Sequence, residues 1–123
     1  MLSAHVPVWG YEFADRRAPF VLPDWIVGLD LGAYHASELA YVFGTSWVFA
    51  DVKRFTPQQK ALSDRMQRLW AAFGTQGFDA EWPRVAGAGP VRVFAPEGDR
   101  MDHDFFTRHH CAFWGGTPFG AVH

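Results

Sequence analysis

Apolar side chains recur at helical spacing in one stretch of the chain, residues 57–73. Polar side chains occupy the opposite face. Thr56 is a suitable N-cap, Pro57 suits the first helical position, and Gln59 lies where it completes a capping box with Thr56. We therefore predict a helix over residues 57–73 that stops at Gly74 and packs on a sheet. The apolar face consists of Leu62, Met66, Leu69, Trp70 and Phe73.

Two stretches have the pattern of strands. Residues 6–13 carry apolar side chains at both alternating sets of positions, which predicts a strand that is buried on both faces. Residues 91–94 predict a short strand at a sheet edge, followed by a turn over residues 95–98. A strand covered on both faces beside a long amphipathic helix is typical of an α/β fold. Because a strand of this kind needs neighbours on both sides, the fold is expected to be incomplete on its own.

The other segments are less regular. Residues 21–30 and 74–90 are rich in proline or glycine and predict loops. We predict a final helix over residues 101–114, because ring-bearing side chains at near-helical spacing would give it an apolar face. They are Phe105, Phe106, His109 and Phe113. The tail from Gly115 onward is expected to be frayed. We interpret residues 1–123 as one partial domain.

Composition narrows the possible partners. Aromatic residues make up 17% of a chain of 123 residues, a load large enough to suggest that some of this surface meets a partner. The net charge is −2, and the lysines and arginines are scattered without forming a basic stripe. Binding to nucleic acid or to an anionic membrane surface is therefore not expected.

The chain offers few clues to its compartment. Its single cysteine, Cys111, has no partner for an internal disulfide. This favours a reducing compartment, or a protein that does not depend on the redox state of its compartment. The first residues lack the cationic start and long apolar run of a secretory signal, and acidic residues and a histidine interrupt the most apolar region before it could span a membrane. These features favour the cytoplasm, although the localisation is otherwise undetermined.

His35 is the best candidate for chemistry. Gly32 and Ala33 allow a tight turn before it, and Leu39, Val42 and Phe43 would fix the following segment to a core. The imidazole has the side-chain pKa closest to neutrality, so a histidine presented by such a loop can accept and return a proton. A structural histidine that is hydrogen-bonded to backbone is the alternative.

No serine has the frame of a hydrolase nucleophile. Ser46 follows Gly44 and Thr45, but a Gly-x-Ser-x-Gly elbow would require a glycine where this chain has Val48. The remaining serines also lack the glycines, namely Ser3, Ser37 and Ser63.

A metal site near the C-terminus is a weaker alternative. Suitable ligand types occur together there, but His103 and His109 are six residues apart rather than the three or four that suit a helix. We therefore predict no metal site and no cofactor. The residues considered are Asp102, His103, Asp104, His109, His110 and Cys111.

Several segments, in this order, resemble the C-terminal part of the type-B carboxylesterases. Residues 34–44 are similar to the histidine loop of that family, residues 8–13 to the strand before it, and residues 61–73 to the following helix with its Trp-x-x-Phe end. Trp82-Pro83 and residues 111–114 match two later landmarks. Each motif alone is weak, but together they cover nearly the whole chain.

The resemblance implies the C-terminal portion of an α/β-hydrolase fold and hydrolysis of a small-molecule carboxylic ester through an acyl-enzyme. It implies that His35 is the triad histidine, which takes a proton from the nucleophilic serine and later gives it to the departing alcohol. Glu38 is similar to a glutamate often found at that place in the family. Because the triad acid normally lies well upstream, we interpret Glu38 as a supporting residue.

The chain departs from the family in what it lacks. The glycine-rich oxyanion loop, the nucleophile elbow and the triad acid precede the strand that resembles residues 8–13, and none of them is in this sequence. The resemblance therefore implies a partner, the N-terminal part of the hydrolase, and an isolated chain without esterase activity. A non-catalytic structural or interaction remnant of the same fold is the alternative.

Overall fold

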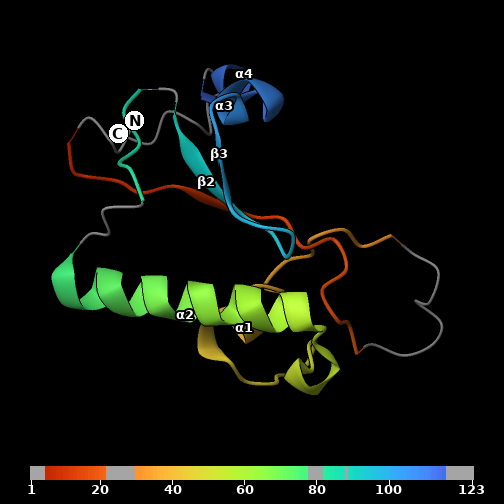
Figure 1. Ribbon diagram of the computed structural model, residues 1–123. Helices are drawn as coiled ribbons and strands as arrows, with labels where there is room; N and C mark the ends of the chain where they lie inside the picture. Colours follow the sequence, from red (N-terminus) through yellow and green to blue (C-terminus); the bar gives the residue numbers. More distant parts are fainter. Residues whose placement is uncertain (1–4, 22–29, 78–81, 88, 116–123) are drawn as a thin grey trace.

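The computed structural model describes residues 5–21, 30–77, 82–87 and 89–115. Three short strands, one long helix and four helices of three to five residues follow one another along the described chain (Figure 1). No helix within these residues is long and apolar enough to cross a membrane. The elements are β1 (Tyr11–Phe13), α1 (Leu39–Phe43), the 3-10 helix η3 (Val52–Arg54), α2 (Pro57–Gln76), β2 (Val91–Phe94), β3 (Arg100–Asp102), α3 (Phe105–Arg108) and α4 (Cys111–Gly115).

The sheet has three strands in the order β1-β2-β3. β1 and β2 are parallel, whereas β2 and β3 are antiparallel. All four residues of β2 are buried. The expectation that residues 91–94 form an edge strand is therefore wrong, because the turn after β2 returns the chain as β3 on its other side. The hydrophobic pattern did not predict β3, because its only apolar residue, Met101, fell within the helix predicted over residues 101–114.

β1 is shorter and less buried than expected. Only Tyr11–Phe13 pair as a strand, although the carbonyl oxygens of Val8 and Gly10 accept hydrogen bonds from Val85 and Arg92. Val6 and Tyr11 are 47% and 39% exposed, so the prediction of burial on both faces is wrong for this chain by itself. The reason is that within the described chain β1 has one neighbouring strand, β2.

α2 begins as predicted and ends three residues later. Thr56 and Gln59 form the reciprocal capping box, with Pro57 at the first helical position. The predicted stop at Gly74 is wrong, because the helix continues to Gln76 and ends at Gly77, whose φ of 75° is the left-handed conformation that favours glycine. Gly74 is exposed, and a glycine inside a helix costs only about 1 kcal/mol relative to alanine, which packing elsewhere along α2 offsets.

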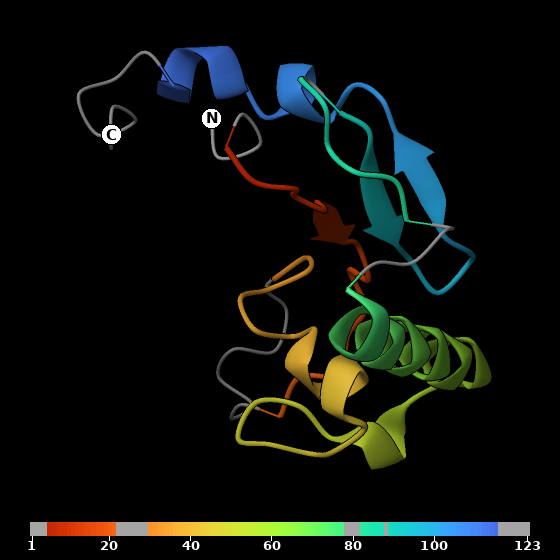
Figure 2. The same cartoon turned by 90° about the vertical axis from the view of Figure 1, so that its left-hand side faces the viewer.

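The apolar face of α2 holds the core together. Leu62, Met66 and Leu69 are buried, as predicted, whereas Trp70 is half-buried and Phe73 is 37% exposed. α1 packs along α2, and both helices lie on the same side of the sheet (Figures 1 and 2). The predicted helix-on-sheet arrangement is therefore present as a small mixed α/β unit.

The C-terminal segment does not form one helix. Residues 101 and 102 belong to β3, and α3 and α4 are separate turns divided at His110, which has a φ of 50°. Phe113 is 67% exposed, so the expected apolar face is not buried within the described chain. The near-helical spacing was misleading because it spanned a strand and a left-handed residue. Of the other expectations, the loop over residues 22–29 and the tail over residues 116–123 lie outside the described residues.

The capping box yields a test of local stability. Thr56→Ala removes the acceptor of the Gln59 backbone N–H and is expected to lower the free energy of unfolding by about 1 kcal/mol. Thr75→Ala is the matched control, since Thr75 is exposed in the last turn and bonds carbonyls of its own helix, so a change within about 0.5 kcal/mol is expected. Urea unfolding followed by circular dichroism measures both. Equal losses would contradict the role of the cap.

Candidate functional site

His35 lies in an exposed turn that leads into α1. Gly32 precedes it with a φ of 59°, which confirms the predicted tight turn, and its N–H donates to Asp30 Oδ1 at 2.9 Å. No hydrogen bond joins the imidazole to another described side chain. The ring is thus free to meet a group from outside this chain, and the alternative of a histidine bonded to backbone finds no support among the described residues.

The turn itself is constrained. Ala36 has a φ of 63°, a left-handed conformation that is uncommon for a residue with a Cβ. Ser37, fully buried, donates its hydroxyl to the carbonyl oxygen of Tyr34 at 2.6 Å, and its N–H bonds the same oxygen at 3.0 Å. Strained backbone of this kind persists only where its surroundings hold it, and it is concentrated at functional sites. The backbone beside the exposed His35 is thus constrained by these two hydrogen bonds and by the conformation of Ala36.

Tyr34, immediately before His35, is fixed by hydrogen bonds of its hydroxyl and by a contact of its ring. Its hydroxyl lies 2.8 Å from the carbonyl oxygen of Pro19 and 3.2 Å from that of Phe49, and its ring meets Phe20 edge to face at 4.7 Å between centroids. Burial of the hydroxyl, with a smaller effect of the Asp15 charge, raises the pKa of Tyr34 to about 12. The neutral phenol is therefore the donor at any ordinary pH.

The residues that fix α1 differ from those predicted. Leu39 is 37% exposed and Phe43 is 69% exposed, so neither holds the segment to the core, whereas Val42 is half-buried and packs against it. Ala40 and Tyr41 are the residues of α1 without exposed surface. The apolar run was misread because the buried face is centred on a tyrosine, a residue type that sequence reasoning left aside.

Tyr41 is bonded to a buried carboxylate that sequence reasoning also missed. Its hydroxyl donates to Asp15 Oδ2 at 2.6 Å, and its ring stacks on Phe55 with centroids 4.3 Å apart. Burial together with the hydrogen bond and charge of Asp15 raises the pKa of Tyr41 well above its usual value. The only sequence signal for Asp15 is its place two residues after the predicted strand over residues 6–13.

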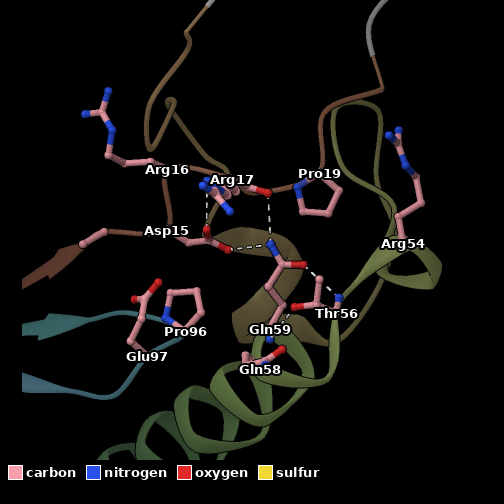
Figure 3. A pocket seen from close by; sticks show the side chains of 11 residues that line it. Asp15, Arg16, Arg17, Pro19, Arg54, Thr56, Gln58, Gln59, Pro96 and Glu97 are labelled. Atoms are coloured by element: carbon pink, nitrogen blue, oxygen red, sulfur yellow. Dashed lines mark hydrogen bonds between the residues drawn. The ribbon is translucent and has the colours of Figure 1, made fainter.

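Asp15 is 3% exposed and receives two further donors. Gln59 Nε2 lies 2.8 Å from Oδ2, and the N–H of Arg17 lies 2.9 Å from Oδ1. Figure 3 shows Asp15 and Gln59 pointing toward each other beneath Arg17. The carboxylate thus joins the loop after β1, α1 and the first turn of α2.

A cavity lies beside this cluster, and His35 is not among the residues that line it. Its volume is about 860 Å³, and Asp15, Gln59 and Glu97 are among the residues that line it. Two arginines on its rim are directed away in Figure 3, since Arg16 pairs with Asp30 at 2.6 Å and Arg54 donates to the carbonyl oxygen of Phe20 at 3.0 Å. The cavity is thus not the site of the histidine chemistry.

The other candidate residues have structural partners. Ser46 donates to Asp51 Oδ1 at 2.9 Å and accepts the N–H of Val52 at 3.1 Å, an arrangement that begins η3 rather than activating a nucleophile. Glu38 is half-buried and makes no hydrogen bond to His35 within the described chain. Its charge, after the larger effect of burial, contributes to a raised pKa of Tyr11.

The residues considered for a metal are spread among other contacts. Arg108 bonds both Asp102 and Glu12, and His109 Nε2 lies 3.8 Å from Glu12 Oε1. Across residues 5–21, 30–77, 82–87 and 89–115, no three His, Cys, Asp or Glu side chains gather as a metal-binding group. Cys111 is a free thiol of intermediate exposure.

A mixed α/β unit that presents a histidine on a constrained turn after a strand is compatible with several classes of hydrolase. The comparison of sequences is specific, because the carboxylesterase family profile matches residues 1–114. The chain belongs to the carboxylesterase family, whose members have the α/β-hydrolase fold.

Individual relatives agree. The chain is 30% identical to an acetylcholinesterase of Bungarus fasciatus over 114 residues, which cover 87% of this chain and 18% of the relative. It is 34% identical to carboxylesterase 5A of Ovis aries over 85 residues, or 61% of this chain and 20% of the relative. An acylcarnitine hydrolase of Rattus norvegicus is 37% identical over 76 residues, or 60% and 12%. The chain thus spans about a fifth or less of the length of these relatives.

The raised pKa values of the tyrosines predict an alkaline limit to the stability of the folded chain. All three tyrosines of the chain have raised pKa values in the folded state, so the folded chain holds these protons more tightly than the unfolded chain does. The free energy of unfolding is therefore expected to be unaffected below about pH 10 and to fall as the pH rises from there toward 12. Tyr34→Phe should reduce the slope of that fall. Urea unfolding between pH 9 and 12 tests this, and an unchanged slope would contradict it.

Proposed function

We propose that this chain supplies the catalytic histidine, His35, to a serine-dependent carboxylic ester hydrolase. The observation that carries the proposal is an exposed imidazole on a constrained turn, within residues 34–44 that resemble the histidine loop of the family to which the chain belongs. In this reaction the imidazole takes the proton of the serine hydroxyl as the oxygen attacks the ester carbonyl. The imidazolium then gives that proton to the departing alcohol.

The rest of the catalytic machinery would come from the N-terminal part of the hydrolase. A serine in a Gly-x-Ser-x-Gly elbow, a carboxylate on the other imidazole nitrogen and an oxyanion hole are all required, and the sequence contains no such elbow. A chain that spans about a fifth of its relatives fits this division. Glu38, in the turn after His35, would support the loop rather than serve as the acid.

The open side of β1 is where that N-terminal part would dock. Within the described chain β1 pairs only with β2, so its other edge is available for a further strand. A cavity of about 160 Å³ adjoins the β1 segment and is lined by five aromatic side chains from this segment, α2 and the loop after it, namely Trp9, Tyr11, Trp70, Phe73 and Trp82. An apolar side chain of the added strand would fill it, and water would leave both surfaces.

Esterase activity tests the role of His35. The purified chain alone is expected to be inactive on p-nitrophenyl acetate, whereas the chain co-expressed with the N-terminal part should hydrolyse it. In that complex His35→Ala is expected to lower kcat by about 10⁴-fold or more, because the general base is lost. His103→Ala, which alters another exposed histidine, should leave kcat within about twofold. Activity that survives His35→Ala would refute the proposed role.

Hydrogen exchange tests where the partner docks. Ala14 N–H donates to Phe94 and Gly10 accepts from Arg92, so the backbone groups of Tyr11 and Phe13 point toward the open edge. Their amides should exchange rapidly in the chain alone and slow at least about tenfold in the complex. The amide of Ala14 is the internal control, because its bond to β2 protects it in both states. Unchanged exchange at Tyr11 and Phe13 would place the partner elsewhere.

A further inference from the structure

The buried carboxylate of Asp15 has no part in the proposed proton transfer, since it makes no hydrogen bond to His35 in the described chain. No lysine, arginine or histidine of the described residues forms an ion pair with it either. A charge that is 3% exposed is costly unless donors satisfy it. Its three donors are therefore structural partners that it holds in fixed places.

Two tyrosines, one before and one after His35, connect the histidine turn to the loop that contains Asp15. Tyr34 precedes His35 and donates its hydroxyl to Pro19, whereas Tyr41 lies six residues after His35 and donates to Asp15. Asp15 and Pro19 belong to the same short loop after β1. The turn that bears His35 is thus bonded to this loop through the hydroxyls of Tyr34 and Tyr41, one on each side of the histidine.

That loop is itself fixed by Asp15. The carboxylate accepts the N–H of Arg17, and Gln59 bridges Asp15 and the carbonyl oxygen of Arg17 with bonds of 2.8 and 3.0 Å from its amide nitrogen. The other end of the Gln59 amide is already used, because Oε1 accepts the Thr56 N–H in the capping box. Gln59 therefore cannot rotate to suit an altered residue 15 without losing the cap.

We propose that Asp15 is a positioning residue, which fixes the His35 turn relative to the end of β1 by binding Tyr41 and the loop that holds Tyr34. For its effect on catalysis, this inference rests on the proposed function. A shift of about 1 Å in a reacting group costs as much as 10²-fold in rate, so a carboxylate that touches no substrate acts on kcat through the imidazole it places.

A second carboxylate provides a matched control. The side chain of Asp99 is 12% exposed and accepts hydrogen bonds from Arg65 and Arg92, so it connects α2 with β2. It forms no hydrogen bond or ion pair with residues 34–41 in the described chain. Asp99→Asn removes a buried charge without disturbing the histidine turn, so it separates a general loss of stability from a loss of positioning.

Nuclear magnetic resonance of the 123-residue chain tests the position of His35 directly. Asp15→Asn replaces one of the two accepting carboxylate oxygens by an NH2 group, which cannot accept a hydrogen bond from these donors. Tyr41→Phe removes only the hydroxyl and keeps the ring that stacks on Phe55. Both are expected to shift the imidazole resonances of His35 and the amide resonances of residues 34–38, whereas Asp99→Asn leaves them in place. Should Asp15→Asn fail to fold, Tyr41→Phe decides the matter.

Kinetics of the complex with the N-terminal part provides the second readout. Asp15→Asn is expected to lower kcat by about ten- to a hundredfold, with KM within about threefold, and Tyr41→Phe should act in the same direction. Unmoved His35 resonances and an unchanged kcat in Tyr41→Phe would overturn the inference, as would equal changes in Asp99→Asn. If His35→Ala leaves the complex active, the proposed function fails, and the resonances still decide whether Asp15 positions the turn.

Discussion

The structure depends on one buried carboxylate with three donors from three segments. Asp15 lies two residues after β1, and its oxygens accept hydrogen bonds from Tyr41 in α1, Gln59 in α2 and the backbone of its own loop. Leaving a buried acceptor without one of its donors costs about 1–3 kcal/mol, and more when the acceptor is charged. The donors therefore belong together, and the relative places of the strand end and the two helices are coupled through a single side chain.

Asp99, in the turn between β2 and β3, forms a second connection between α2 and the sheet. Arg65 on α2 reaches it with Nε and Nη2, and Arg92 in the central strand reaches its second oxygen at 3.0 Å. Arg65 also donates to the carbonyl oxygen of Ala95, at the end of β2. α2 is thus joined by carboxylates to the ends of both parallel strands, while its apolar face fills the space between. Burial supplies most of the stabilisation, and the polar bonds fix the register.

Sequence reasoning succeeded where the signal was local. The capping box and apolar stripe predicted α2, and Gly32 predicted the turn before His35, because each depends on residues close in the chain. It failed where pairing decides the outcome. The central place of β2 depends on β3, whose sequence has a single apolar residue, and the break at His110 depends on a backbone conformation that side-chain spacing does not encode. Asp15 and Tyr41 lie 26 residues apart, so no local pattern could pair them.

The surroundings of Asp15 and those of Tyr11 differ in how many of their contacts this chain supplies. Around Asp15 each polar group has a partner from this chain, and the turn that bears His35 is rigid although the imidazole is exposed. Around Tyr11 the opposite holds, since aromatic rings line a cavity and β1 pairs with one strand among the described residues. Within the described chain, the turn that bears His35 thus makes its polar contacts internally, whereas the aromatic surface around Tyr11 is left for the proposed N-terminal part to cover.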